Sequence, residues 1–435
     1  MAIGESWGRT FSAIHTLRPR HWVHQSLPQN IKGEPLLAYG LGKSYGDSCL
    51  NDGGVLMPMQ EMEHVISFNR ENGILRCEAG ITLETILQLC VPAGWFLPVV
   101  PGTKFITLGG AIANDIHGKN HHGAGTFGCH VLAFELLRSD NSRTLCTPDS
   151  NEGLFNATIG GLGLTGLITW AEIKLKKISN ACIEMESIKV RDLDEFLDVS
   201  ANSDKDFEYT VSWLDSLAKG RNSGKGVFLR GNHGTDSNQE LKVHSSPKLT
   251  WPIDAPNFLL NGLSIKAFNF LYYNKQFSRK KRSIVHYDSF FFPLDSVHNW
   301  NRVYGKRGFF QYQFVLPFME GHMAVRDILN IISESGQGSF LAVIKTFGEI
   351  KSPGILSFPQ PGVTVALDFP NCGRKTRELF DRMDEIIISN QGRLYPAKDA
   401  CMSADAFKSF YPELEQFRPY MDPAFSSSFW RRVNN

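Results

Sequence analysis

The sequence predicts an α+β protein of two domains. The 435 residues exceed what one hydrophobic core usually holds, so two domains are expected. Up to about residue 178, short apolar runs alternate with glycine-rich turns. Between about 309 and 398 the order strand, helix, strand occurs twice, which is typical of an antiparallel sheet with helices on one side.

In the first region, the short apolar runs Gly54–Met57 and Ile74–Cys77 predict strands, and Thr82–Cys90 predicts a helix. In the later region, three strands and two helices are expected. The strands are 309–317, 340–347 and 363–369, and the helices are 324–334 and 377–390, with Gly392 just past the end of the second.

Composition narrows the functional class. The chain is 42% hydrophobic and 20% charged with a formal net charge of +1, which is typical of a soluble globular protein and argues against nucleic-acid binding. Eight scattered cysteines without a C-x-x-C pair predict reduced thiols of a cytoplasmic protein and no zinc site. The N-terminus lacks the pattern of a signal peptide, and there is no apolar run of about 18 residues.

The stretch GLGKSYGD, Gly40–Asp47, resembles the end of a nucleotide-triphosphate loop. Such a loop needs a glycine five residues before Gly42, where this chain has Leu37, so we reject a P-loop. Two further glycine clusters follow at 101–113 and 160–166. Each alone is what surface turns produce, but three in one domain predict a long ligand lying against the backbone.

The strand at 309–317 places Gln311 and Gln313 on one face and aromatic residues on the other. Thr364, Ala366 and Asp368 likewise share a face of their strand, and Lys345 interrupts the apolar run 340–347. These residues either face bulk water or form the polar wall of a pocket that hydrogen-bonds hydroxyls or a phosphate.

The loop NDIHGKNHH, residues 114–122, combines side chains suited to proton transfer and anion binding. Zinc binding by His117, His121 and His122 is disfavoured because no carboxylate or cysteine completes the set. A solvated polar loop is the remaining alternative.

The segment 257–273 is rich in Phe, Leu and Tyr, and the basic run 279–282 follows it. Apolar side chains beside a basic cluster suit an anionic lipid surface. A core helix followed by a solvated loop explains the pattern equally well.

Taken in order, GLGKSYGD, PGTKFITLGGAIANDIHGKNHH, GGLGLTG, FFQYQFVLP and GRLYPAKD resemble the flavoprotein subunits of decaprenylphosphoryl-β-D-ribose 2′-epimerases. These belong to the vanillyl-alcohol-oxidase superfamily of FAD-dependent oxidoreductases. The resemblance extends from about residue 10 to about 430 and implies the PCMH-type FAD-binding fold. It implies an FAD-binding domain at 1–178, completed by 393–435, and an inserted antiparallel-sheet substrate domain at 179–392.

The resemblance also implies which residues bind the flavin. They are Gly40, Leu41, Gly42, Lys43, Ser44, Tyr45, Gly102, Thr103, Thr107, Gly109, Gly110, Ala113, Asn114, His117, Gly163, Thr165, Gly166, Ile168, Tyr395, Ala397 and Lys398. Many superfamily members attach FAD covalently through a histidine in the first turn. Lys43 occupies that position here, so we expect non-covalent FAD.

By the same resemblance, Lys398 lies beside the flavin, and the general base is Lys398, Tyr45 or His117. The residues implied to line the substrate pocket are Lys119, Trp213, Phe291, Gln311, Gln313, Lys345, Thr364 and Ala366. Ala366 and Thr364 stand where the mycobacterial enzymes carry cysteine and asparagine, which leaves the exact sugar and lipid carrier open.

The expected reaction is oxidation of the C2 hydroxyl of a polyprenyl-phosphate-linked pentose, such as decaprenylphosphoryl-β-D-ribose, to the 2-keto sugar. A short-chain reductase then completes the epimerisation to arabinose for cell-envelope polysaccharide synthesis. Two alternatives are oxidation of a small soluble alditol or aldonolactone, and a non-catalytic flavin-binding subunit. We expect a cytoplasmic location with peripheral contact at the inner membrane through 257–282.

Overall fold

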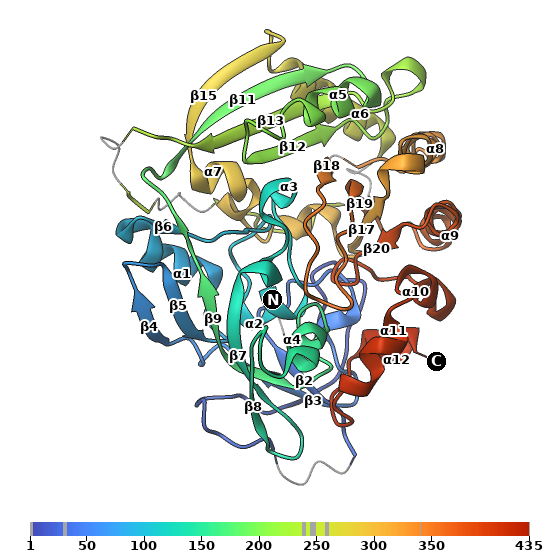
Figure 1. Cartoon of the computed structure of the whole chain (residues 1–435). Coiled ribbons are helices and arrows are strands. Elements are labelled where there is room, and N and C mark those ends of the chain that lie inside the picture. Colours follow the sequence, from blue (N-terminus) through green and yellow to red (C-terminus); the bar gives the residue numbers. More distant parts are fainter. Residues whose placement is uncertain are drawn as a thin grey trace.

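The computed structural model describes residues 3–28, 33–236, 241–243, 249–256, 261–339 and 341–434. Residues 257–260 of the predicted lipid-contact segment and Phe340 of a predicted strand lie outside these ranges. So do Met1, Ala2, residues 29–32 and Asn435, all within the regions expected to form the FAD-binding domain. The described part is a mixed α and β structure whose larger sheets are antiparallel (Figure 1).

The N-terminal region of the described chain contains two sheets. One is parallel, in the order β1 (Thr16–Leu17), β3 (Val55–Pro58), β2 (Leu36–Tyr39). The other is antiparallel, in the order β4 (Val65–Asn69), β5 (Ile74–Glu78), β9 (Leu167–Lys174), β7 (Val131–Leu137), β8 (Arg143–Cys146). β3 and β5 confirm the two strands predicted in this region.

Short helices pack against these sheets. α1 (Leu83–Cys90) begins where Thr82 accepts a hydrogen bond from the Thr85 backbone, and it buries Leu83, Ile86 and Leu87. The other helices of this region are α2 (Leu108–Ala113), α3 (His121–Ala124) and α4 (Glu152–Thr158).

The second large sheet spans most of the remaining described chain. Its order is β15 (Lys280–His286), β11 (Cys182–Val190), β13 (Gly226–His233), β12 (Tyr209–Leu214), β18 (Ala342–Phe347), β19 (Gly362–Pro370), β17 (Phe309–Leu316), β20 (Arg393–Leu394). Two-stranded pairs are formed by β6 (Trp95–Phe96) with β10 (Lys176–Lys177), and by β14 (Leu249–Thr250) with β16 (Val297–His298). β17, β18 and β19 confirm the three predicted strands.

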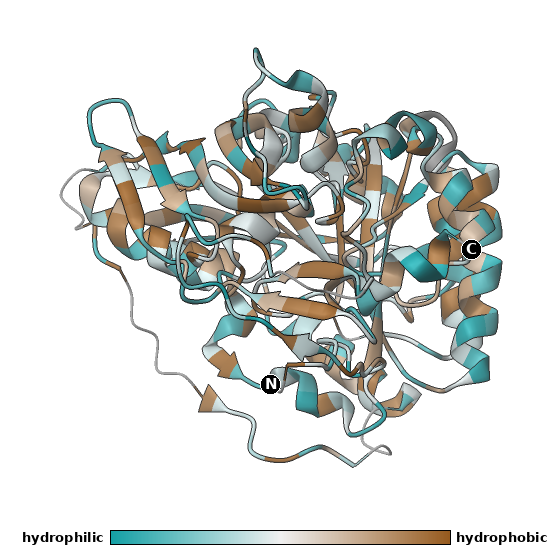
Figure 2. Cartoon of the chain, turned by 90° about the horizontal axis from the view of Figure 1, so that it is seen from below, coloured by the Kyte–Doolittle hydropathy of each residue, from teal (hydrophilic) through white to brown (hydrophobic). Residues whose placement is uncertain are grey.

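The two faces of β17 and β19 have different neighbours. The aromatic face of β17 and the Val363–Phe369 face of β19 pack on α8 (Phe318–Ser335) and α9 (Arg374–Ser389). Figure 1 shows both helices on one side of these strands, as predicted. Figure 2 shows teal and brown alternating along the helices at the edge of the molecule that carries the C terminus. The apolar face of the sheet therefore builds a core, and the polar face points the other way.

The polar face does not meet bulk water. Gln313, Thr364 and Asp368 are 4%, 1% and 0% exposed, and α3 contacts β18. Figure 1 places α3 on the side of β18 away from α8 and α9. The water-facing alternative is therefore wrong, because the loop 114–122 covers this side of the sheet.

The basic run 279–282 is not a solvated loop. Lys280–Arg282 begin β15, an edge strand of the sheet, and Lys280 and Arg282 both contact Glu186 of β11, at 2.9 and 2.8 Å. The apolar segment before it forms α6 (Gly262–Asn274), which begins with a capping box at Asn261 and Ser264. The remaining helices here are α5 (Leu193–Ala201) and α7 (Tyr287–Phe291).

The last described residues return to the first part of the chain. They form α10 (Ala404–Phe410), α11 (Leu414–Phe417) and α12 (Ser428–Val433). On α12, Arg432 contacts Asp47 at 2.8 Å and Asp399 at 2.9 Å, and these two carboxylate side chains are 4% and 3% exposed. A buried charge cluster thus ties the C-terminal helix to the turn after Tyr45 and to the loop after Lys398.

Candidate active site

The three glycine clusters lie against one another. An ideal Cβ on Gly40 would come within 2.6 Å of Thr107 Oγ1, so the first cluster touches the start of α2. The Leu162 backbone donates to the Ala113 carbonyl at 2.8 Å, which fixes the third cluster at the end of the same helix. Segments separated by more than a hundred residues therefore converge, as one long ligand requires.

The C-terminal segment completes this arrangement. Tyr395 donates its hydroxyl to the Asn114 carbonyl at 2.9 Å, and the Tyr45 backbone donates to the Ala397 carbonyl at 3.1 Å. The residues expected beside the flavin ring thus contact both the first and the second cluster.

Unpaired backbone amides identify where an anionic group fits. Within the described chain, the N–H groups of Gly40–Lys43 and of Gly102 and Thr103 donate to no protein acceptor. An amide in a partly buried turn needs a partner, and a row of such amides suits a pyrophosphate. An ideal Cβ on Gly102 would meet no atom within 4 Å, so this turn faces open space. These residues fit FAD.

Lys43 occupies the position from which other superfamily members tether the flavin. Its Nζ lies 3.7 Å from the centre of the Trp7 ring. Burial lowers the pKa of Lys43 to about 8, against the opposing charge of Asp295. The side chain is thus held by an aromatic ring, and no imidazole is present at this position.

One group of predicted site residues surrounds His117. Its Nδ1 lies 2.9 Å from Lys345 Nζ, and its Nε2 lies 3.0 Å from the amide nitrogen of Gln313. Lys345 also donates to the Gly118 carbonyl at 2.6 Å. Gln313 in turn reaches Thr364 Oγ1 at 3.4 Å. The loop 114–122 and the polar face of the sheet therefore form one hydrogen-bonded unit.

Burial governs the charges of this unit. It lowers the pKa of His117 well below its ordinary value, and the positive charge of Lys345 lowers it further. The pKa of Lys345 is also well below its ordinary value because of burial and of the charges of Lys119 and Lys398. His117 is consequently neutral at pH 7.

A second group surrounds Tyr45. The Nζ of Lys398 lies 4.1 Å from the centre of the Tyr45 ring, a cation–π contact. Burial lowers the pKa of Lys398 to about 8, while the charge of Asp368 opposes the change. Burial also raises the pKa of Tyr45 well above its ordinary value, and its hydroxyl hydrogen-bonds the Gln311 side chain.

Sequence reasoning left Asp368 out of the site, although it noted that residue on the polar face. Its carboxylate accepts from Gln311 Nε2 at 2.6 Å and from the Tyr304 hydroxyl at 3.3 Å. The sequence signal that could have identified Asp368 is its position on the same strand face as Thr364 and Ala366.

His121 was considered only as a metal ligand. It is 2% exposed, its ring lies 4.4 Å from that of Phe347, and neither of its ring nitrogens has a hydrogen-bond partner among the described residues.

The remaining predicted substrate residues lie near the same sheet. Lys119 donates to the Phe291 carbonyl at 3.3 Å. Trp213 pairs with Val343 of β18 and packs on Tyr272 of α6, with ring centres 4.6 Å apart. Ala366 is opposite Gln313 in the register of β17 and β19. Lys119, Phe291 and Ala366 thus border the polar wall, and Trp213 connects it to α6.

One predicted flavin residue has its side-chain hydroxyl engaged elsewhere. Thr165 is fully buried and hydrogen-bonds Thr158 at 2.9 Å. Ile168 is a buried residue of β9.

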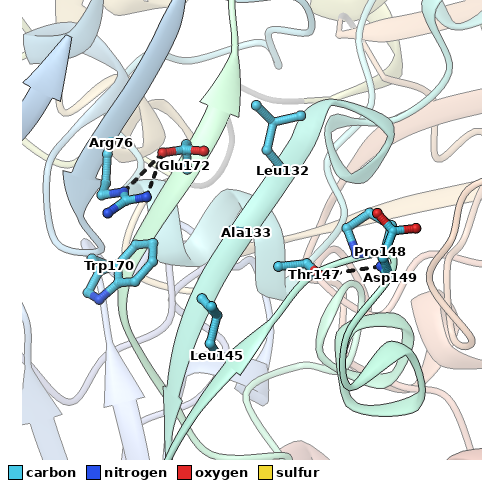
Figure 3. Close-up of a pocket in the computed structure, with 9 residues that line it drawn as sticks. All are labelled: Arg76, Leu132, Ala133, Leu145, Thr147, Pro148, Asp149, Trp170 and Glu172. Atoms are coloured by element: carbon cyan, nitrogen blue, oxygen red, sulfur yellow. Dashed lines mark hydrogen bonds and ion pairs between the residues drawn. The ribbon is translucent and has the colours of Figure 1, made fainter. Parts of the chain in front are cut away.

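A surface pocket of about 530 Å³ lies on the antiparallel sheet of the N-terminal region (Figure 3). In Figure 3, Arg76 pairs with Glu172, and its guanidinium lies 4.5 Å from the centre of the Trp170 ring. None of the predicted site residues lines this pocket. Within the described ranges, no three His, Cys, Asp or Glu side chains are grouped as a metal site, and all eight cysteines are free.

Comparison with known proteins agrees with this geometry. The family model described as FAD binding domain matches residues 29–147. Decaprenylphosphoryl-beta-D-ribose oxidase of Mycolicibacterium smegmatis is 35% identical over 98% of this chain and 96% of its own length.

Two other relatives match less closely. An uncharacterized protein of Streptomyces coelicolor is 31% identical over 81% of this chain and all of its own length. The human Delta(24)-sterol reductase is 31% identical over 27% of this chain and 23% of its own length. The chain therefore belongs to the family of FAD-dependent oxidoreductases that includes decaprenylphosphoryl-beta-D-ribose oxidase.

Proposed function

We propose that this oxidoreductase oxidises the C2 hydroxyl of a polyprenyl-phosphate-linked pentose, such as decaprenylphosphoryl-β-D-ribose, to the 2-keto sugar. The observation that carries the proposal is the polar wall between the sheet and the loop 114–122. Lys119, Lys345 and Lys398 lie along this wall, and Asp368 is the carboxylate with which Lys398 interacts. Three amine groups against one carboxylate in a buried site fit an anionic sugar phosphate, whose charge would favour their protonated forms, better than a neutral alditol or aldonolactone.

We assign the chemistry to Lys398, Tyr45 and His117. Bound FAD supplies the acceptor for the hydride from the alcohol carbon. Lys398 stabilises negative charge that develops beside it during the reaction. Its contact with the Tyr45 ring holds the ammonium group in position for this role. His117 is neutral, and its Nε2, now held by the Gln313 amide, would accept the hydroxyl proton once the substrate hydroxyl takes the place of that amide. Gln311 and Gln313 orient hydroxyl groups of the sugar.

We further propose that residues 1–178 and 393–435 form the FAD-binding domain and 179–392 the substrate domain. The row of unpaired amides at Gly40–Lys43 and the contacts from Tyr45 to Ala397 support the first assignment. The polar wall on β17, β18 and β19 supports the second.

The 2-keto product requires reduction from the opposite face to complete an epimerisation. We assign that step to a separate short-chain reductase, whose arabino product would serve cell-envelope polysaccharide synthesis.

A lipid-linked substrate needs access from a membrane, and α6 with β15 offers a suitable surface. Leu263, Phe270 and Leu271 of α6 are 80%, 64% and 67% exposed, and Phe277 is 98% exposed. Arg279 follows, with 74% of its side chain exposed. Exposed apolar side chains beside basic ones bind anionic lipid headgroups. In the described ranges, no helix combines the length and apolarity needed to span a bilayer.

The reaction is tested by mixing the FAD-loaded protein anaerobically with decaprenylphosphoryl-β-D-ribose and following the flavin absorbance. We expect bleaching with this compound and none with decaprenyl phosphate, which lacks the sugar. Lys345→Met should slow bleaching, whereas Lys351→Met, at an exposed position beyond β18, should not. Bleaching by an aldonolactone alone would instead assign the enzyme to soluble sugars.

The membrane contact is tested by sedimentation with vesicles of phosphatidylglycerol or of phosphatidylcholine. We expect binding to the anionic vesicles, and loss of binding in Leu271→Glu. The matched control is Leu145→Glu, because Leu145 is also exposed but lies on the other large sheet. Equal effects of both variants would contradict an α6 contact.

A further inference from the structure

Asp368 is a buried carboxylate that the assigned chemistry leaves unused. It lies near the C-terminal end of β19, on the same face as Thr364 and Ala366, and is 0% exposed. Burying a carboxylate costs several kcal/mol unless hydrogen bonds or opposite charges compensate. Its surroundings must therefore account for its presence.

Direct compensation comes from neutral groups. Gln311 donates at 2.6 Å and the Tyr304 hydroxyl at 3.3 Å. Tyr304 is itself fixed by stacking on Phe309, with ring centres 4.1 Å apart. Within the described chain, no lysine or arginine lies within 4.0 Å of the carboxylate. The positive charge that acts on the Asp368 carboxylate is that of Lys398, from a longer distance.

The contact to Lys398 runs through two other side chains. Gln311 hydrogen-bonds both Asp368 and the Tyr45 hydroxyl. The ring of Tyr45 carries Lys398 on its face, 4.1 Å from the ring centre. Asp368, Gln311, Tyr45 and Lys398 therefore form one continuous row from the sheet to the C-terminal turn.

Several charged or titratable groups face this row. Burial raises the pKa of Asp368 to about 7, against hydrogen bonding by Gln311 and the charge of Lys398. Asp368 is the group that opposes the loss of the Lys398 proton. The other titratable groups whose charges interact with this row, from the elements packed around it, are Tyr304, His117, Lys345 and Asp295.

We propose that Asp368 is a positioning residue that keeps Lys398 in its ammonium form and, through Gln311, fixes the direction of the Tyr45 hydroxyl. The inference rests on the proposed role of Lys398 in the FAD-dependent reaction. With the Asp368 carboxylate in place, Lys398 retains its positive charge near neutral pH. Without it, burial removes the Lys398 proton at lower pH.

The test measures the midpoint reduction potential of the bound flavin between about pH 6 and 10, a range that lies on both sides of the lowered pKa of Lys398 and below the ordinary pKa of lysine. This measurement needs no substrate. The wild-type plot should bend near pH 8, the pKa of Lys398, and the bend should be absent in Lys398→Met. In Asp368→Asn it should move down by about one pH unit. Asp368→Ser, equally uncharged, should show the same shift and serves if the first variant does not fold.

The matched control is Asp384→Asn. Asp384 also accepts a hydrogen bond from a tyrosine hydroxyl, that of Tyr312, but on the opposite face of the sheet, and burial raises its pKa to about 7 as well. This variant should leave the bend in place. A bend unmoved in the Asp368 variants, or absent from the wild type, would overturn the proposal. Failure of lipid-linked ribose to bleach the flavin would overturn the proposed substrate and leave this test unaffected.

Discussion

Replacing Arg432 by Met should destabilise the protein in a pH-dependent way. Arg432 contacts Asp47 and Asp399 at 2.8 and 2.9 Å, and the three side chains are 23%, 4% and 3% exposed. Removing one partner of a buried ion pair costs about 3–5 kcal/mol, and we expect the lower end because Arg432 is partly exposed. The unfolding entropy of a chain this long is about 0.9 kcal/mol per kelvin, so Tm should fall by about 3 °C.

The sign of the pH dependence follows from the carboxylates that remain. Burial raises the pKa of Asp47 in the folded protein, even though Arg432 opposes the change. Without Arg432, the folded-state pKa of one carboxyl rises further above its unfolded value, so the folded state binds the extra proton. The loss of Tm should therefore be largest near neutral pH and shrink as the pH falls toward 5.

Circular dichroism melting of the FAD-free protein at several pH values measures both effects. Arg431→Met is the control, because Arg431 donates to the neutral Asn51 and to the Asp52 carbonyl. It should cost about 1 kcal/mol without a pH trend. Equal losses in the two variants, or a loss in Arg432→Met that grows on acidification, would refute the reasoning.

Three other outcomes are expected. Lys398→Met should retain FAD but slow flavin reduction by about 10²–10³-fold, measured by stopped-flow absorbance; an unchanged rate would contradict its assigned role. Gly102→Ala should fold normally but bind FAD more weakly, because its methyl group enters open space beside unpaired amides. Gly46→Ala should not fold, because its Cβ would lie 1.8 Å from the Asp399 carbonyl oxygen. Acid precipitation should release all flavin to the supernatant, since Lys43 occupies the tethering position; flavin in the pellet would contradict that reading.

The central strands and helices could be predicted because each carries one uninterrupted apolar face. Phe310, Tyr312 and Phe314 alternate with polar residues, and helix α9 repeats Leu379 and Met383 at helical spacing. Such periodicity is local, so it can be read without knowing what packs against it.

The strands β11, β12, β13 and β15 were not predicted. β12 is buried along its whole length. β15 is a charged edge strand whose Lys280 and Arg282 contact Glu186 of β11, its neighbour in the sheet but distant in sequence. Neither pattern alternates, and the partner that makes each one a strand lies far away in sequence.

The polar faces of the central strands were predictable, but the contacts that they make were not. Alternation placed Gln311, Gln313 and Asp368 on polar faces, yet whether those faces met water depended on the loop 114–122. The pairing of His117 with Lys345 joins residues 228 positions apart, which no local pattern encodes.

The short strand β20 has a consequence for how this family can diversify. β20 hydrogen-bonds to β17, the strand that carries Gln311 and Gln313, and the chain reaches Lys398 only four residues later (Figure 1). The turn that carries Lys398 and the polar wall of the sheet therefore share one backbone frame, and an insertion or deletion between them would misalign both. New substrate preferences are expected to evolve by exchanging side chains on the wall, as at Thr364 and Ala366, while the backbone stays unchanged.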